Sequence, residues 1–67
     1  MDVAPGRYRH FKGAVYVVTG VARHSETEEW FAVYHREGSD ELWLRPITMW
    51  IEQVDRDGYL GPRFAAI

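Results

Sequence analysis

The stretch His24-Ser25-Glu26-Thr27 contains the residue types in this sequence that most resemble a catalytic group. A serine nucleophile needs a histidine base within hydrogen-bond reach and a third group that orients the base. Adjacency in the chain does not provide this geometry, and no GxSxG motif surrounds Ser25. Two interpretations stay open: a loop whose hydroxyls bond its own backbone, and a loop in which His24, Ser25 and Thr27 contact a ligand.

Histidine and cysteine usage bears on metal and redox chemistry. The only histidines are His10, His24 and His35, without HxH or HExxH spacing, and there is no cysteine. A structural zinc site needs about four nitrogen or sulfur ligands, so no metal site is predicted. The lack of cysteine also excludes a disulfide, an iron–sulfur cluster and a thiol nucleophile. Without a Gly-rich loop for a nucleotide phosphate, we expect no cofactor.

Basic residues form a second candidate group. They are Arg9, His10, Lys12, Arg45 and Arg63. If pairing of the strands brings some of them together, their arginines are suited to bind a carboxylate or phosphate through two hydrogen bonds each. The alternative is that each pairs with an acidic residue of the same chain, for which Glu26 and Glu52 are candidates.

Aromatic residues are frequent: three Trp, four Tyr and three Phe. Most must fill the core of so small a domain, because each buries about 150–250 Å². Exposed rings on small β domains line grooves for peptides or bases, and Tyr8, Tyr16, Tyr34 and Trp43 are the candidates. Trp43 shares a strand face with Arg45, which sets a ring beside a guanidinium group.

The elements that position these residues are predicted to be strands. Segments 14–22, 30–36 and 41–45 are rich in β-branched and aromatic residues or alternate in polarity. Shorter candidates cover 8–12 and 52–54, and 59–64 is an extended edge segment because Pro62 cannot donate to a ladder. Gly20 marks a bend or bulge. Pro46 ends a strand and begins one short helical turn.

About five short strands with regular turns predict a single all-β domain over residues 1–67. An SH3-like barrel is the expected architecture, because closing a sheet removes its exposed edges. An OB-fold usually needs a longer chain.

Charge and hydropathy limit the classes of partner. Eight basic and ten acidic residues give a net charge of −2, which disfavours a general nucleic-acid binder. The positive first 24 residues keep a nucleic-acid-binding barrel open as an alternative. No apolar run approaches the roughly 20 residues of a membrane helix, and the N-terminus lacks an apolar signal core. We therefore expect a soluble cytoplasmic protein.

Four separated motifs carry a resemblance. They are Tyr8-Arg9-His10-Phe11-Lys12-Gly13, His24-Ser25-Glu26-Thr27, Trp43-x-Arg45-Pro46 and Pro62-Arg63-Phe64. In order and spacing the chain resembles the bacterial domain of unknown function 1653 family over nearly its whole length. Trp50 stands where that family is expected to have Phe. The resemblance implies a compact β domain that occurs as a stand-alone small protein, and it carries no established activity.

These observations favour a non-catalytic binding or interaction module for an anionic or aromatic ligand, a peptide or a protein. The predicted ligand-binding residues are Arg9, His10, His24, Ser25, Thr27, Tyr34, Trp43, Arg45 and Arg63. A nucleic-acid-binding barrel and, less favoured, a small enzyme with His24 as general base are the alternatives. An exposed Trp would favour a homodimer.

Overall fold

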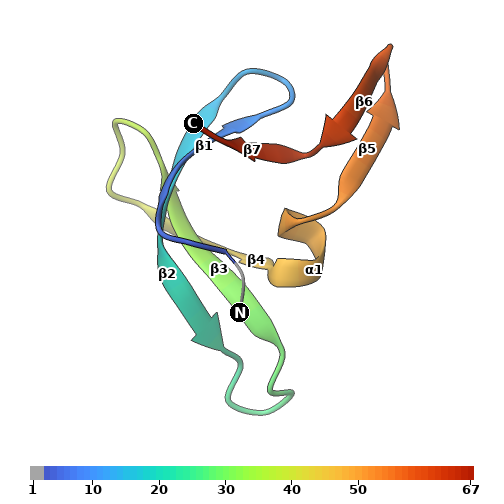
Figure 1. The fold of residues 1–67 in the computed structure, drawn as a ribbon. Coiled ribbons are helices and arrows are strands. Elements are labelled where there is room, and N and C mark those ends of the chain that lie inside the picture. Colours follow the sequence, from blue (N-terminus) through green and yellow to red (C-terminus); the bar gives the residue numbers. More distant parts are fainter. Residues whose placement is uncertain (1–2) are drawn as a thin grey trace.

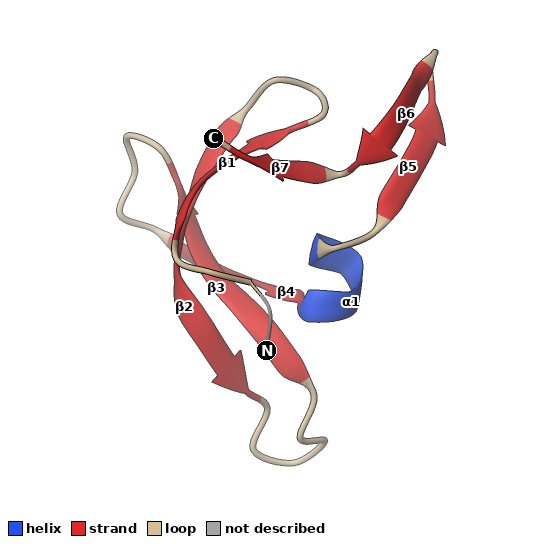
Figure 2. Ribbon diagram, viewed as in Figure 1, coloured by secondary structure: helices blue, strands red, loops and turns tan. Residues whose placement is uncertain are grey.

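The structure, a computed structural model, describes residues 3–67. Within this range the chain is mostly β, with seven strands and one short helix (Figure 1, Figure 2). In chain order they are β1 (Gly6–His10), β2 (Val15–Arg23), β3 (Trp30–Arg36), β4 (Leu42–Pro46), α1 (Ile47–Trp50), β5 (Gln53–Arg56), β6 (Tyr59–Pro62) and β7 (Phe64–Ala66). The predicted all-β character is confirmed, and α1 is the helical turn predicted after Pro46.

The strands form one antiparallel sheet and a separate ribbon. The sheet order is β4-β3-β2-β1-β7, and among the described residues β5 pairs only with β6. The sheet curves around α1 while the ribbon projects to one side (Figure 1). The expected SH3-like barrel is not confirmed, because within residues 3–67 the sheet stays open with β4 and β7 at its edges. The predicted number of strands was too low because the segment after Gly58 makes two strands, one on β5 and one on β1.

Strand β2 contains the irregularity predicted at Gly20. Val18 pairs with Tyr34 and Gly20 pairs with Val33, so the register shifts across Thr19. A bulge of this kind bends a strand and changes which side chains face the core. Beyond it, Val21 packs against the same core as Val18. The Thr19 hydroxyl donates a hydrogen bond to the Val33 carbonyl at 3.2 Å, which holds the bulge against β3.

The β5–β6 ribbon turns at Asp57 and Gly58, whose φ angles are 54° and 79°. Two successive positive φ angles define the hairpin turn for which Asp-Gly is a preferred pair. Pro62 lies in this ribbon, outside the five-stranded sheet, as its missing N–H predicts.

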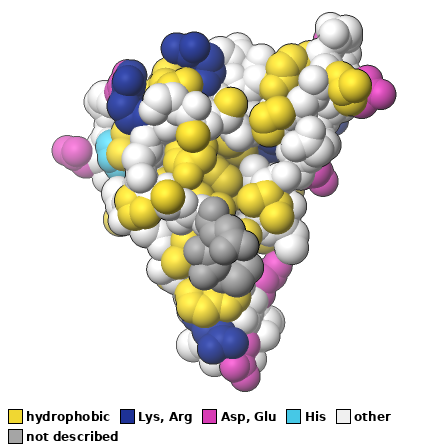
Figure 3. Space-filling model, viewed as in Figure 1, with side chains coloured by type: hydrophobic (Ala, Val, Ile, Leu, Met, Phe, Trp, Pro, Cys, Tyr) yellow, Lys and Arg dark blue, Asp and Glu magenta, His cyan; other side chains and the backbone are white. Residues whose placement is uncertain are grey.

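The core lies between α1 and one face of the sheet. Its buried members are Val3, Val18, Ala32, Tyr34, Ile47, Trp50 and Phe64. Ile47 and Trp50 are three positions apart and therefore share one side of α1, and each is only 2% exposed. In the space-filling view, apolar side chains gather at the centre, between the sheet and the ribbon (Figure 3).

No helix within residues 3–67 has the length and apolar character needed to cross a bilayer.

Candidate functional site

The face of the sheet that packs on α1, here called the inner face, collects the rings and several basic residues. Directly paired residues of antiparallel strands point to the same side of a sheet. Tyr34 pairs with Trp43, and His10 pairs with Phe64. Arg45 pairs with the core residue Ala32 and so joins the inner face. Strand alternation therefore brings Trp43 and Arg45 to one side, as the sequence predicts.

Phe64 lies at the centre of these residues. Its ring stacks on Trp50 with parallel planes and 3.8 Å between centroids. The His10 and Tyr16 rings meet it edge-on, at 5.0 and 5.8 Å. The Arg45 guanidinium lies over the same ring, 5.4 Å from its centroid. Phe64 thus connects the apolar core to a histidine and an arginine at its margin.

Arg63, the neighbour of Phe64 in the chain, has a carboxylate partner. Its Nη2 lies 2.5 Å from Oε1 of Glu52, and its side chain is 16% exposed. Its backbone N–H also donates to the Glu52 carbonyl at 2.9 Å. This pair agrees with the sequence interpretation that named Glu52 as an acidic partner. The Nε of Arg63 is buried without an acceptor among residues 3–67.

Arg45 differs from the other arginines. Arg7 and Arg23 pair with Glu37 and Glu28 at exposed positions. Among residues 3–67, Arg45 is the only arginine that is partly buried and has no ion pair. Its Nε is buried without an acceptor there, as is Nε1 of Trp50. A half-buried charge without a counter-charge is costly, since burial removes solvation and no opposite charge replaces it.

His10 experiences this excess of positive charge. Burial, together with the charges of Arg63, Arg45 and Lys12, lowers the pKa of its imidazole below the ordinary value of 6.5. The backbone N–H of Lys12 donates to Nδ1 of His10 at 3.1 Å, so the hydrogen of the neutral ring belongs on Nε2. His10, Arg45 and Arg63 form what we call the basic cluster.

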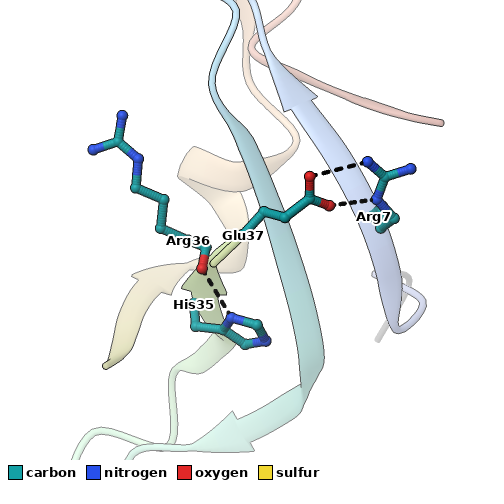
Figure 4. A network of polar contacts seen from close by, with 4 residues as sticks. All are labelled: Arg7, His35, Arg36 and Glu37. Atoms are coloured by element: carbon teal, nitrogen blue, oxygen red, sulfur yellow. Dashed lines mark hydrogen bonds and ion pairs between the residues drawn. The ribbon is translucent and has the colours of Figure 1, made fainter. Parts of the chain in front are cut away.

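A pocket of about 310 Å³ adjoins the basic cluster. Its lining residues are Tyr16, Tyr34, Arg36, Ser39, Glu41 and Trp43. Tyr16 joins the two regions, because its ring also contacts His10 and Phe64. Arg36 points away from Arg7 and Glu37, which make a two-bond ion pair on the other side of the sheet (Figure 4). The pocket therefore offers rings and a mixture of both charges.

The remaining predicted site residues lie elsewhere. His24, Ser25 and Thr27 occupy the loop between β2 and β3, where Nδ1 of His24 accepts the N–H groups of Glu26 and Thr27 at 3.1 and 3.2 Å. The Thr27 hydroxyl accepts the N–H of Glu29 at 3.3 Å, which agrees with the interpretation of a loop whose hydroxyls bond its own backbone. Arg9 pairs with Val15, on the side of β1 opposite to His10.

Sequence reasoning did not select Arg36, Ser39 and Glu41 as site residues. Arg36 was detectable in principle, because it lies two positions after Tyr34 in β3 and so shares its face. Ser39 and Glu41 lie in the turn between β3 and β4. The alternation of side chains along a strand does not predict the path of the backbone through such a turn.

Fold and site together define a small open-sheet β domain with a basic–aromatic cluster on its inner face. Residues 6–66 match the family described as "Protein of unknown function (DUF1653)", and the chain belongs to that family. The resemblance found from the sequence motifs is thus confirmed.

A solved structure agrees with this assignment. A DUF1653 protein from Bordetella bronchiseptica, known from a crystal structure, shares 39% sequence identity with this chain. The two structures superpose with a TM-score of 0.87. The match covers 98% of this chain and 88% of the other. No curated protein matches the chain.

Proposed function

We propose that this domain is a non-catalytic binding module that recognises an oxyanion, such as a phosphate, sulfate or carboxylate group, at the basic cluster. The observation that carries the proposal is the partly buried Arg45 charge, which no carboxylate among residues 3–67 balances. Glu52 pairs with Arg63 and leaves Arg45 for a ligand. An arginine is suited to this role because its planar group holds an oxyanion through two parallel hydrogen bonds.

The buried donors near Arg45 limit which atoms can meet the anion. Nε of Arg45, Nε of Arg63 and Nε1 of Trp50 are buried N–H donors without acceptors in residues 3–67. An unpaired buried donor costs about 1–3 kcal/mol. These three atoms are almost fully shielded, so an oxyanion would bond to the terminal nitrogens of Arg45, which are not among them. The adjoining pocket, with Tyr34 and Trp43 in its wall, would hold an aromatic or apolar part attached to the anion.

A sulfate titration followed by ¹H–¹⁵N NMR tests the proposal. The indole N–H of Trp50 and the backbone amides of Arg45, Arg63 and Phe64 should shift progressively and saturate, because these groups surround the basic cluster. The indole N–H of Trp30 is the internal control, since its ring lies next to Arg23. Chemical-shift changes that are spread evenly over the chain, that do not saturate, or that are largest at Trp30 would contradict an anion site at the basic cluster.

A further inference from the structure

Strand β4 exposes three consecutive large apolar residues at an open sheet edge. Leu42 is 61% exposed, Trp43 is 52% exposed and Leu44 is 61% exposed. Because β4 is the terminal strand of the order β4-β3-β2-β1-β7, one side of its backbone has no neighbouring strand within residues 3–67. Proteins usually protect such edges with charges, prolines, bulges or a covering element, because an apolar edge pairs readily with another strand. Pro46 and Arg45 protect only the end of β4.

We propose that a second copy of this chain covers the edge, with β4 of each copy pairing antiparallel to form a continuous sheet across a two-fold axis. The observations behind this proposal are separate from those behind the oxyanion site, but the two proposals share one residue. In the dimer, Glu41 of the second copy would lie opposite Arg45, so it would compete there with an oxyanion. The dimer proposal rests on the exposure of residues 42–44 and on the order of charges around them.

The sequence of β4 is complementary to itself when reversed. Glu41 precedes the three apolar residues and Arg45 follows them. An antiparallel pair of identical strands brings the acidic end of each copy beside the basic end of the other, twice per dimer. Opposite charges across a strand pair stabilise it, and like charges there destabilise it. This complementarity favours a second copy over an unrelated peptide.

Three symmetric registers place the axis within this apolar segment, and their side-chain pairs differ. An axis at Trp43 pairs Leu42 with Leu44 of the other copy, Trp43 with Trp43, and Glu41 with Arg45. An axis at Leu42 instead sets Glu41 opposite Trp43 and Asp40 opposite Leu44. An axis at Leu44 sets Leu42 opposite Pro46, which has no N–H to donate to a ladder. Only the axis at Trp43 matches apolar with apolar and acid with base at every position from 41 to 45.

Disulfide cross-linking reads this register directly, because the natural chain has no cysteine. Single variants Leu42→Cys, Trp43→Cys and Leu44→Cys are oxidised mildly in chloride buffer without sulfate, because Arg45 also belongs to the basic cluster. Directly opposed residues have Cα atoms about 4.5–5.5 Å apart, within the range that a disulfide spans. We expect Trp43→Cys to cross-link with itself and a mixture of Leu42→Cys and Leu44→Cys to form the mixed dimer. Neither leucine variant should cross-link efficiently alone.

Leu60→Cys is the matched control, because Leu60 is 78% exposed but lies on the separate β6 ribbon. Cross-linking at the proposed pairs should be about tenfold faster than in this control, since association raises the local thiol concentration.

Sedimentation equilibrium measures the association of the natural chain. The protein concentration should extend to about 1 mM, because small interfaces give weak complexes. We expect a monomer–dimer equilibrium that Leu44→Glu abolishes. A chain that stays monomeric, or β4 variants that all cross-link at the rate of the control, would overturn the proposal. Self-cross-linking of Leu42→Cys or Leu44→Cys alone would overturn the register.

Discussion

Replacing Trp50 with alanine should leave the chain largely unfolded at room temperature. The Trp50 side chain is 2% exposed, stacks on Phe64 at 3.8 Å and contacts the rings of Tyr8 and Tyr34 at 5.5 and 5.0 Å. Removing a buried Trp costs about 3–5 kcal/mol. A core of this size supplies no more than roughly 3–5 kcal/mol in total, so the loss equals the stability that is available.

Circular dichroism during thermal unfolding measures this effect, with two matched variants. Trp50→Phe keeps a ring on Phe64 and should still fold, in agreement with the Phe expected at this position in the family. Met49→Ala changes the adjacent residue of α1, which is 42% exposed, and should shift the melting temperature by only a few degrees. A Trp50→Ala chain that unfolds cooperatively near the melting temperature of the natural protein would show that α1 does not hold the core together.

Replacing Arg45 with glutamine should weaken sulfate binding by roughly 10- to 100-fold. Hydrogen bonds to a charged group contribute about 1.5–3 kcal/mol, and each 1.4 kcal/mol is about a factor of ten in affinity. Glutamine keeps part of the contact with Phe64 but has no charge. The variant should therefore still unfold cooperatively, since Arg45 makes no ion pair within residues 3–67 that holds the fold.

Arg9→Gln is the control for this experiment, because it removes the same charge from the opposite side of the sheet. Isothermal titration at low salt compares both variants with the natural chain, since salt screens exposed charges. Equal losses in the two variants would mean that sulfate responds only to the overall charge. A collapse of the folded state in Arg45→Gln with unchanged affinity in the residual folded protein would assign Arg45 to the scaffold.

The local elements of this fold were predictable from sequence because their signals are local. Alternation and β-branched residues placed β3 at residues 30–36, where the structure has it. Pro46 predicted the helical turn, and Gly20 predicted the bulge in β2. Proline and glycine affect the backbone at their own positions, and the alternation of side chains is a property of one strand alone.

The arrangement of strands was less predictable because it depends on contacts between distant segments. The barrel was expected because closing a sheet removes its exposed edges, and the segment 59–64 was expected to be a single edge segment. Instead, Asp57 and Gly58 turn β6 back onto β5, and β7 joins β1 through the pairing of Phe64 with His10. The grouping of His10 and Arg63 follows from that pairing. No spacing along the chain predicts it.

The pKa of His10, measured by NMR with and without sulfate, tests the oxyanion site most directly. Sulfate is the probe because its charge is constant over the range of about pH 5–8 in which histidine titrates. Without sulfate, burial and the positive neighbours hold the pKa of His10 below 6.5. A bound anion favours the protonated ring, so the pKa of His10 should rise when sulfate is added, and sulfate should bind more tightly as the pH falls. If sulfate binds and the pKa of His10 does not move, the anion occupies another place and the basic cluster is not its site.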